Sequence, residues 1–207
     1  MNIAILGCGY VAEFYGLTLE NHSNLQLVGA FDRNPAALAE FQRRWPCRSY
    51  SSLAEMASDP GVELVLNLTN PRSLFETTSE LLLRGKHVYS EKPVAMNVAQ
   101  ALELRDLAAA RGLYLGAAPC SVLGGAAQTL WRALSNGVVG RVRLVYGNFD
   151  DGMIAPALSP WNWRNASGVP WPAKDEFEVG CTYEHAGYLL TWLAAFFGPA
   201  LAVTSFA

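Results

Sequence analysis

The chain has 207 residues, which is enough for one large hydrophobic core or for one domain and part of another. Hydrophobic residues make up 51% of the sequence and charged residues 16%, a globular composition that argues against intrinsic disorder. The net charge of −3 and the scattered lysines and arginines argue against a nucleic-acid-binding protein.

Strand-like and helix-like patterns alternate through the first 118 residues. Helical spacing predicts helices in the connections, and Asn34 followed by Pro35 is a typical helix start. This alternation predicts βαβ units and therefore a doubly wound parallel sheet with right-handed crossovers. We assign residues 1–118 to this α/β domain. Short apolar runs predict its buried strands at residues 2–6, 25–32, 62–68, 86–90 and 113–118.

The pattern changes at Pro119, so we place a domain boundary after Ala118 and assign residues 119–207 to a second domain. The final apolar segment begins a strand that has no successor, and we therefore expect this domain to be incomplete. Its predicted elements are a helix at 125–136, a strand at 141–149, a loop rich in Pro, Gly and Trp at 150–174, and a helix at 185–197.

A glycine-rich turn follows the first predicted strand and opens the first helix. Gly7, Gly9 and Ala12 form the pattern G-x-G-x-x-A, with Tyr10 and Val11 between the last two. The first glycine permits a tight turn, the second allows a pyrophosphate to approach the backbone, and a small third residue lets the helix pack on the strand. The N–H groups at the helix start favour phosphate binding. This turn therefore predicts a dinucleotide site.

An acidic residue closes the second predicted strand. Asp32 stands where a carboxylate accepts hydrogen bonds from an adenosine ribose, and its charge would repel a 2′-phosphate, so we favour NAD as cofactor. Arg33 follows directly and could bind that phosphate, which leaves NADP as an alternative. Two other readings stay open at this point: an ordinary turn with a surface aspartate, and a methyltransferase with a similar glycine loop.

Two further turns lie at the predicted carboxyl ends of strands, where open α/β sheets bind ligands. Thr69, Asn70 and Pro71 follow one strand, and we predict that they contact the cofactor, although a simple turn would use the same residue types. Glu91 and Lys92 follow the next strand and precede a proline, which restricts the backbone of Lys92. Lys92 can hydrogen-bond a substrate oxygen or exchange a proton, and Glu91 can orient it.

The order of these motifs resembles the Gfo/Idh/MocA family of oxidoreductases. The resemblance covers essentially the whole chain, from the glycine loop through "TNP" and "GKHVYSEKP" to "EVGCTYEHAGYLLTWL". It implies an N-terminal Rossmann domain and an α+β domain with a mainly antiparallel sheet that binds substrate and mediates homo-oligomerisation when complete. It also implies NAD- or NADP-dependent oxidation or reduction at a hydroxyl-bearing carbon of a sugar, cyclitol or related molecule. The matching catalytic residues are Lys92 and His185.

The chain departs from the family pattern in three ways. Cys181 stands where many members carry an aspartate four residues before the motif histidine, which puts a borrowed acid–base relay in doubt. Leu74 or Phe75 replaces a histidine that often follows the "TNP" segment. Family members are also considerably longer, which implies a shortened second domain. A truncated, non-catalytic dinucleotide-binding protein is therefore the alternative to a dehydrogenase.

We assign His185 as the proton acceptor, since its reference pKa suits proton exchange near neutral pH, and Lys92 as the cation that polarises the substrate oxygen. The opposite division of roles stays open. Trp163 and Arg164 are candidate substrate-binding residues in a loop that also contains Trp161 and Trp171, although these rings could simply anchor the loop.

Four widely spaced cysteines predict free thiols in a reducing cytoplasm, without a metal site or a disulfide framework. The N-terminus lacks the pattern of a signal peptide, and no apolar run is long enough to span a bilayer. We therefore expect a soluble cytoplasmic enzyme that acts on a small, sugar-like molecule and contacts neither nucleic acid nor membrane.

Overall fold

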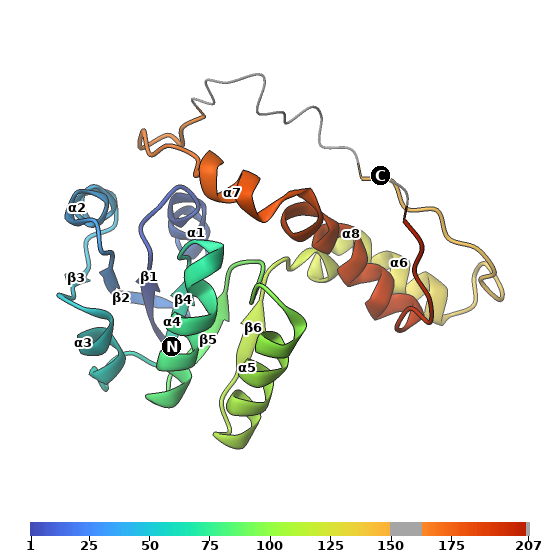
Figure 1. Cartoon of the computed structure of the whole chain (residues 1–207), viewed down its shortest axis with the longest axis horizontal. Helices are drawn as coiled ribbons and strands as arrows, with labels where there is room; N and C mark the ends of the chain where they lie inside the picture. Colours follow the sequence, from blue (N-terminus) through green and yellow to red (C-terminus); the bar gives the residue numbers. More distant parts are fainter. Residues whose placement is uncertain (150–162, 206–207) are drawn as a thin grey trace. The chain divides into compact units, whose positions relative to one another are not determined.

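The computed structural model describes residues 1–149 and 163–205, and these group into two compact units (Figure 1). The first unit contains residues 1–118. Residues 163–178 return to the first unit, whereas the sequence placed them in the second domain. The second unit contains residues 119–149 and 179–205 of the described chain.

Six parallel strands form the sheet of the first unit, in the order β3-β2-β1-β4-β5-β6. The strand order reverses beside β1, which is the position where open α/β sheets place their ligand crevice. Leu6 pairs with both Phe31 and Asn67, and Asn67 pairs with Ser90, so the loops that follow these strands emerge along one edge. The strands are β1 (Asn2–Leu6), β2 (Gln26–Phe31), β3 (Arg48–Ser49), β4 (Leu64–Asn67), β5 (His87–Ser90) and β6 (Leu115–Ala117).

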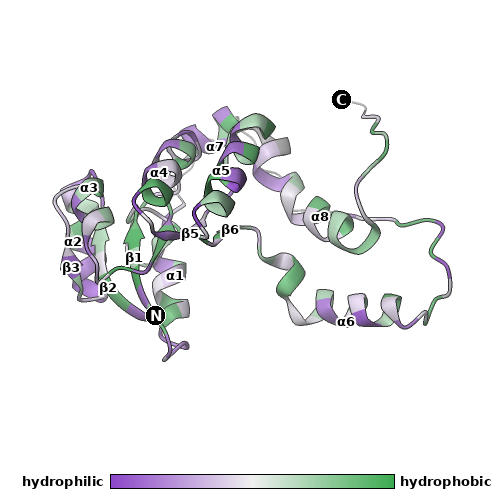
Figure 2. Ribbon diagram, turned by 90° about the horizontal axis from the view of Figure 1, so that it is seen from below, coloured by the Kyte–Doolittle hydropathy of each residue, from purple (hydrophilic) through white to green (hydrophobic). Residues whose placement is uncertain are grey.

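Helices cover both faces of this sheet, because successive side chains of a buried strand point to opposite faces. Ile3 and Ile5 of β1 pack with residues of α1 (Ala12–Leu19) and α2 (Pro35–Arg44). Ala4 and Leu6 belong to the core on the other face, together with residues of three further helices. Figure 2 shows the apolar character of β1 and β2. The three helices are α3 (Leu53–Ser58), α4 (Pro71–Leu83) and α5 (Val98–Ala110).

Polar side chains fix where several of these helices begin. Asn34 accepts a hydrogen bond from the Ala36 N–H at the start of α2, as the sequence predicted, with Pro35 in the first turn. Asn70 caps α4 in the same way, by accepting from the Ser73 N–H. The six parallel strands, with helices on both faces, confirm the doubly wound parallel sheet predicted for residues 1–118.

The second unit is helical in its described residues, and the antiparallel sheet implied by the family resemblance is not seen there. The predicted strand at residues 141–149 is wrong for this structure: the segment pairs with no other described strand, and Leu144 and Tyr146 are largely exposed. A strand obtains its hydrogen bonds only from a neighbouring strand, so the sequence pattern alone cannot form one. The elements of this unit are η1 (Ser121–Leu123), α6 (Gly125–Ser135) and α8 (Cys181–Phe197).

A short helix, α7 (Ala173–Val179), follows the turn at residues 163–171, and most of it belongs to the first unit. Among the described helices, none combines the length and the apolar character needed to cross a bilayer.

Candidate functional site

The two glycines of the loop between β1 and α1 serve different purposes. Gly7 has φ +92°, and a Cβ there would lie 2.8 Å from the Leu68 carbonyl oxygen, so only glycine lets this loop pass the end of β4. Its N–H donates to the Phe31 carbonyl at 2.9 Å. A Cβ on Gly9, in contrast, would meet nothing within 4 Å. Glycine at position 9 is therefore not required by the packing of the described protein atoms.

Asp32, which directly follows β2, accepts a hydrogen bond from the same loop. One carboxylate oxygen accepts from the Cys8 N–H at 2.7 Å, and the other accepts from the Asn34 N–H at 2.7 Å. Burial, with a contribution from the Asp32 charge, raises the pKa of the Cys8 thiol. A thiol held in its protonated form is a poor nucleophile, so Cys8 packs in the core and is not a reactive cysteine.

A hollow of about 670 Å³ opens beside Asp32, at the carboxyl ends of β2 and β3. Its volume lies within the range of small-molecule sites. Its walls combine apolar side chains with hydroxyl and charged groups, as a nucleoside site requires. The lining residues are Phe31, Asp32, Arg33, Pro35, Leu38, Ser49, Tyr50, Ser51 and Glu55.

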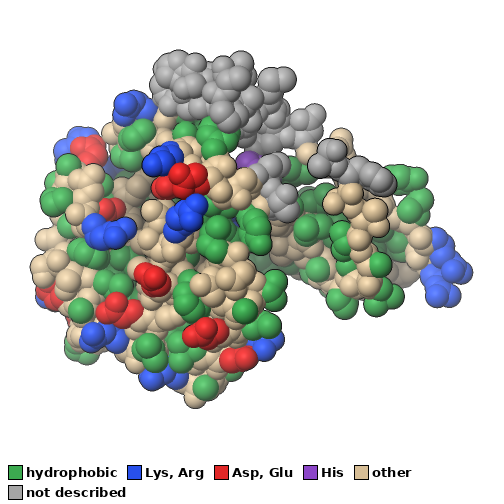
Figure 3. Space-filling model, viewed as in Figure 1, with side chains coloured by type: hydrophobic (Ala, Val, Ile, Leu, Met, Phe, Trp, Pro, Cys, Tyr) green, Lys and Arg blue, Asp and Glu red, His purple; other side chains and the backbone are tan. Residues whose placement is uncertain are grey.

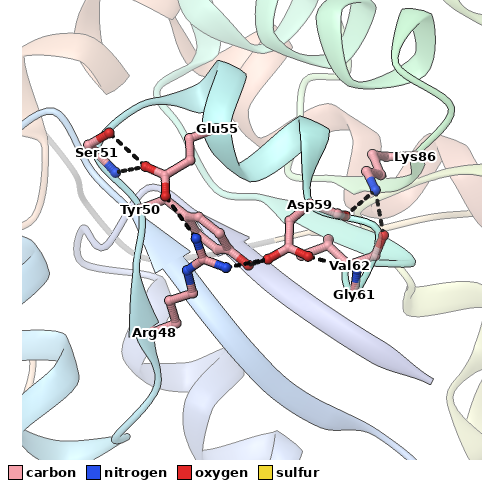
Figure 4. A network of polar contacts seen from close by, with 8 residues as sticks. All are labelled: Arg48, Tyr50, Ser51, Glu55, Asp59, Gly61, Val62 and Lys86. Atoms are coloured by element: carbon pink, nitrogen blue, oxygen red, sulfur yellow. Dashed lines mark hydrogen bonds and ion pairs between the residues drawn. The ribbon is translucent and has the colours of Figure 1, made fainter.

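A polar network holds one wall of this hollow in place (Figure 4). Arg48 donates to Glu55 at 2.9 Å and to Asp59 at 2.8 Å, and the Tyr50 hydroxyl donates to Asp59 at 2.8 Å. Burial and the Asp59 carboxylate raise the pKa of Tyr50 to about 12, so this hydroxyl stays protonated. Glu55 also accepts from the N–H and the hydroxyl of Ser51. The network fixes Tyr50 and Ser51 before any ligand arrives.

Asn67, fully buried at the end of β4, shapes the next turn. Its amide nitrogen donates to the hydroxyls of Thr77 and Thr78 at 2.7 and 2.9 Å. Its oxygen accepts from the Thr69 hydroxyl at 2.8 Å. The structure thus places Thr69 at the carboxyl edge of the sheet, while Asn70 and Pro71 begin α4. A cofactor role for these three residues stays a prediction.

Glu91 and Lys92 follow β5, and Glu91 is held from two sides. The Tyr15 hydroxyl of α1 donates to one Glu91 oxygen at 2.7 Å, and the Lys92 N–H donates to the other at 3.0 Å. Burial lowers the pKa of Lys92, while the carboxylates of Glu176 and Glu91 oppose that shift. The Lys92–Pro93 peptide bond is cis. Lys92 is therefore a partly desolvated amine at the same edge as the glycine loop.

Trp163 and Arg164 lie in the closed turn at residues 163–171, which belongs to the first unit. The Trp163 ring lies 5.2 Å from that of Trp171, and the Arg164 guanidinium donates to the Gly168 carbonyl at 2.6 Å. The predicted substrate contacts of Trp163 and Arg164 stay predictions. Trp161 lies outside the described residues.

His185 lies in α8 of the second unit. Its ring contacts an aromatic group in that unit, with centroids 6.1 Å from Phe149 and 6.4 Å from Tyr188. Lys92 and His185 thus belong to different units, and their catalytic pairing stays a prediction. In the described part of the chain, no group of three or more metal-binding side chains occurs.

Sequence reasoning missed the residues that support this site. Asn67 gave a weak signal, a polar residue at the end of an apolar strand, but Tyr15 and Glu13 read as ordinary helix residues. Their partners, Glu91 for Tyr15 and Arg44 for Glu13, are 76 and 31 positions away.

Over the face of the first unit seen in Figure 3, acidic and basic side chains are interspersed without a large patch of one sign.

Comparison with known proteins agrees with this geometry. Residues 1–118 match the GFO_IDH_MocA family model, described as an oxidoreductase family with an NAD-binding Rossmann fold. The chain is 31% identical to trans-1,2-dihydrobenzene-1,2-diol dehydrogenase of Sus scrofa, over 73% of this chain and 45% of that protein. It is 28% identical to D-xylose dehydrogenase of Paenarthrobacter nicotinovorans, over 74% of this chain and 41% of that protein.

Among solved structures, the chain is similar to the WlbA dehydrogenase from Chromobactrium violaceum in complex with NADH and UDP-GlcNAcA. The TM-score is 0.64 and the identity 27%, over 68% of this chain and 41% of that one. The chain spans about half the length of the curated relatives it matches.

Proposed function

Because the chain belongs to the Gfo/Idh/MocA family of oxidoreductases with an NAD-binding Rossmann fold, we propose that it is an NAD(P)-dependent dehydrogenase acting on CH–OH groups. Its substrate would be a sugar, cyclitol or related polyol. One observation carries the proposal: the open face of Gly9, the carboxylate of Asp32 and the partly desolvated Lys92 follow the parallel strands β1, β2 and β5 at the same edge of the sheet.

The residues present fit a dinucleotide. Gly9 leaves room for a pyrophosphate beside the backbone of Tyr10 and Val11, at the start of α1. Asp32 would accept hydrogen bonds from the adenosine ribose, and the hollow beside it would hold the adenosine. Each Asp32 oxygen already accepts one backbone N–H and can accept another donor, because a carboxylate offers about four lone-pair sites.

The bound nicotinamide would supply hydride transfer at its C4 atom, and the chain's own residues would manage the substrate oxygen. Lys92 would polarise this oxygen, with Glu91 fixing the backbone from which the lysine projects. His185 would take the hydroxyl proton. Burial supports the role of Lys92, because a desolvated ammonium interacts more strongly with a developing alkoxide than one in water.

The names of relatives support a sugar-like substrate. One relative is a D-xylose dehydrogenase, and one similar structure holds UDP-GlcNAcA beside NADH. We propose the same broad class here, with homo-oligomerisation through the second domain and a cytoplasmic location as further parts of the proposal.

The test is a titration with NADH and NADPH, followed by turnover assays with a panel of sugars, cyclitols and nucleotide sugars. Lys92→Ala and His185→Ala are then assayed with the best substrate. We expect each variant to lose at least about a hundredfold in kcat, the usual contribution of a positioned acid or base. Near wild-type turnover in both variants would refute these roles.

Cofactor preference is tested through Asp32. If its charge excludes a 2′-phosphate, Asp32→Ser lowers affinity for NADH and raises it for NADPH, whereas Arg33→Ala weakens NADPH alone. An unchanged ratio of the two affinities in Asp32→Ser would remove Asp32 from the ribose site.

A second candidate is dinucleotide binding without turnover. It is favoured by Cys181 at the position of the family aspartate. NADH binding is expected under both proposals, while turnover with any member of the substrate panel is expected only under the first.

A further inference from the structure

Residues 163–171 form a turn that is closed by its own backbone and by one buried amide. Asn165 donates its N–H to the Val169 carbonyl at 3.0 Å, and its side-chain oxygen accepts from the Val169 N–H at 2.8 Å. The Trp171 N–H donates to the Trp163 carbonyl at 2.8 Å. Asn165 is only 9% exposed. The turn is therefore an ordered part of the first unit.

Two hydrogen bonds fasten this turn to the start of α1. The Asn165 amide nitrogen donates to the Tyr10 carbonyl at 3.0 Å, and the Ser167 N–H donates to a Glu13 carboxylate oxygen at 2.9 Å. The partners are 155 and 154 positions apart in the chain. Tyr10 directly follows Gly9, so the contact reaches the backbone at which the proposed pyrophosphate would lie.

Glu13 accepts one of the two hydrogen bonds of this attachment, and its carboxylate is buried. It is 4% exposed, and its other oxygen accepts from the Arg44 guanidinium at 2.9 Å. A buried carboxylate is tolerated only when it is paired and hydrogen-bonded. Arg44, at the end of α2, and the Ser167 N–H meet that requirement together. Glu13 therefore joins three segments that are distant in sequence.

We propose that Glu13 and Asn165 are positioning residues for dinucleotide binding, because they fasten the 163–171 turn to the glycine-rich loop and hold that loop in its binding conformation. The inference rests on the proposed function. A loop that is already ordered loses less conformational entropy when a ligand binds, so affinity rises without any new contact to the ligand. By linkage, bound dinucleotide must also strengthen the attachment of the turn.

The experiment compares wild type, Glu13→Ala, Glu13→Gln, Asn165→Ala and the control Glu103→Ala, in the 207-residue chain. Glu103 is exposed on α5 and loses the same charge. Two quantities are measured: the Kd for NADH and NADPH by fluorescence titration, and the rate of tryptic cleavage after the exposed Arg164 by mass spectrometry. Thermal unfolding shows which variants are folded.

We expect Glu13→Ala and Asn165→Ala to raise the Kd of the preferred dinucleotide roughly five- to twentyfold and to speed cleavage after Arg164, since each loses a buried hydrogen bond. Glu13→Gln keeps an acceptor for the Ser167 N–H and should fall between wild type and Glu13→Ala. Saturating dinucleotide should slow cleavage in wild type, and Glu103→Ala should match wild type in both measurements.

Faster cleavage with an unchanged Kd in Glu13→Ala and Asn165→Ala would show that the turn merely packs on α1, and the inference would be wrong while the proposed function stood. Unchanged cleavage and Kd in both variants would also overturn it. If Glu13→Ala fails to fold, Asn165→Ala decides the matter, because it leaves the Glu13–Arg44 pair intact. A wild-type chain that binds neither dinucleotide would refute the proposed function itself, and the inference with it.

Discussion

The Tyr15 hydroxyl donates a hydrogen bond to a Glu91 oxygen at 2.7 Å and thereby joins α1 to the turn that carries Lys92. The rings of Tyr15 and Tyr89 also contact each other, with centroids 6.3 Å apart. Glu91 uses its second oxygen to accept from the Lys92 N–H at 3.0 Å. The glycine-loop helix and the lysine turn are therefore mechanically coupled through one carboxylate.

Tyr15→Phe should remove this coupling while preserving the ring. We expect the free energy of unfolding to fall by about 1.5–3 kcal/mol, the usual contribution of a hydrogen bond to a charged group. We expect kcat/KM to fall roughly three- to tenfold, because the backbone of Lys92 loses its brace. Denaturant titration and steady-state kinetics measure both. Tyr114→Phe is the matched control, since Tyr114 is 77% exposed, and equal effects in the two variants would contradict the prediction.

Gly7→Ala and Gly9→Ala should separate folding from binding within one loop. At position 7 the positive φ and the 2.8 Å approach to the Leu68 carbonyl should cost about 1–3 kcal/mol of stability or prevent folding. At position 9 the added methyl group meets no described atom, so stability should stay within about 1 kcal/mol of wild type. NADH affinity in Gly9→Ala should nevertheless fall at least about tenfold, because the methyl group occupies the space of the pyrophosphate. Thermal unfolding and NADH titration decide, and wild-type NADH affinity in Gly9→Ala would count against the proposed site.

Lys92→Met should abolish turnover and remove one source of the pH dependence of stability. Burial lowers the pKa of Lys92 from its ordinary value of 10.5, so between the lowered pKa and 10.5 the folded chain binds fewer protons than the unfolded chain. Stability therefore rises with pH across that window, because the folded chain disfavours the charged form of Lys92 relative to the unfolded chain. Lys92→Met should lack this rise, so its stability relative to wild type should fall as the pH approaches 10.5. Urea unfolding at several pH values measures this trend.

Lys86→Met is a separate test, of a lysine with a structural role. Burial also lowers the pKa of Lys86, but its ammonium donates to the carbonyls of Asp59 at 2.6 Å and Val62 at 2.8 Å. Methionine would leave both acceptors without this donor, so we expect a loss of about 2–4 kcal/mol. A loss below about 0.5 kcal/mol in Lys86→Met would contradict this structural role.

Asn67→Ala should be among the most damaging single substitutions in the first unit. The side chain is fully buried and serves Thr69, Thr77 and Thr78, so its removal leaves several polar groups unsatisfied. We expect a loss of about 2–4 kcal/mol in the free energy of unfolding. Asn21→Ala is the control, because Asn21 is exposed and makes one long contact at 3.5 Å. A loss below about 0.5 kcal/mol at position 67 would contradict this reading, since that is the scale of ordinary surface substitutions.

Local signals in the sequence determined most of the first unit. The apolar runs predicted each long strand, Asn34 with Pro35 predicted the start of α2, and the spacing of Gly7, Gly9 and Asp32 predicted a dinucleotide site. These features depend on neighbours in the chain or on alternation between strand and helix, which a single sequence displays directly.

The tertiary structure alone decided how the site is supported. It placed Tyr15 against Glu91, gathered Asn67 with Thr77 and Thr78, and brought residues 163–171 from the presumed second domain onto Tyr10 and Glu13 of the first. It also left residues 141–149 without a strand partner among the described residues. The contacts of Tyr15, Asn165 and Ser167 span 76 or more positions and leave no periodic trace in one sequence. Hydrogen bonds between distant segments depend on where the chain returns and not on local spacing.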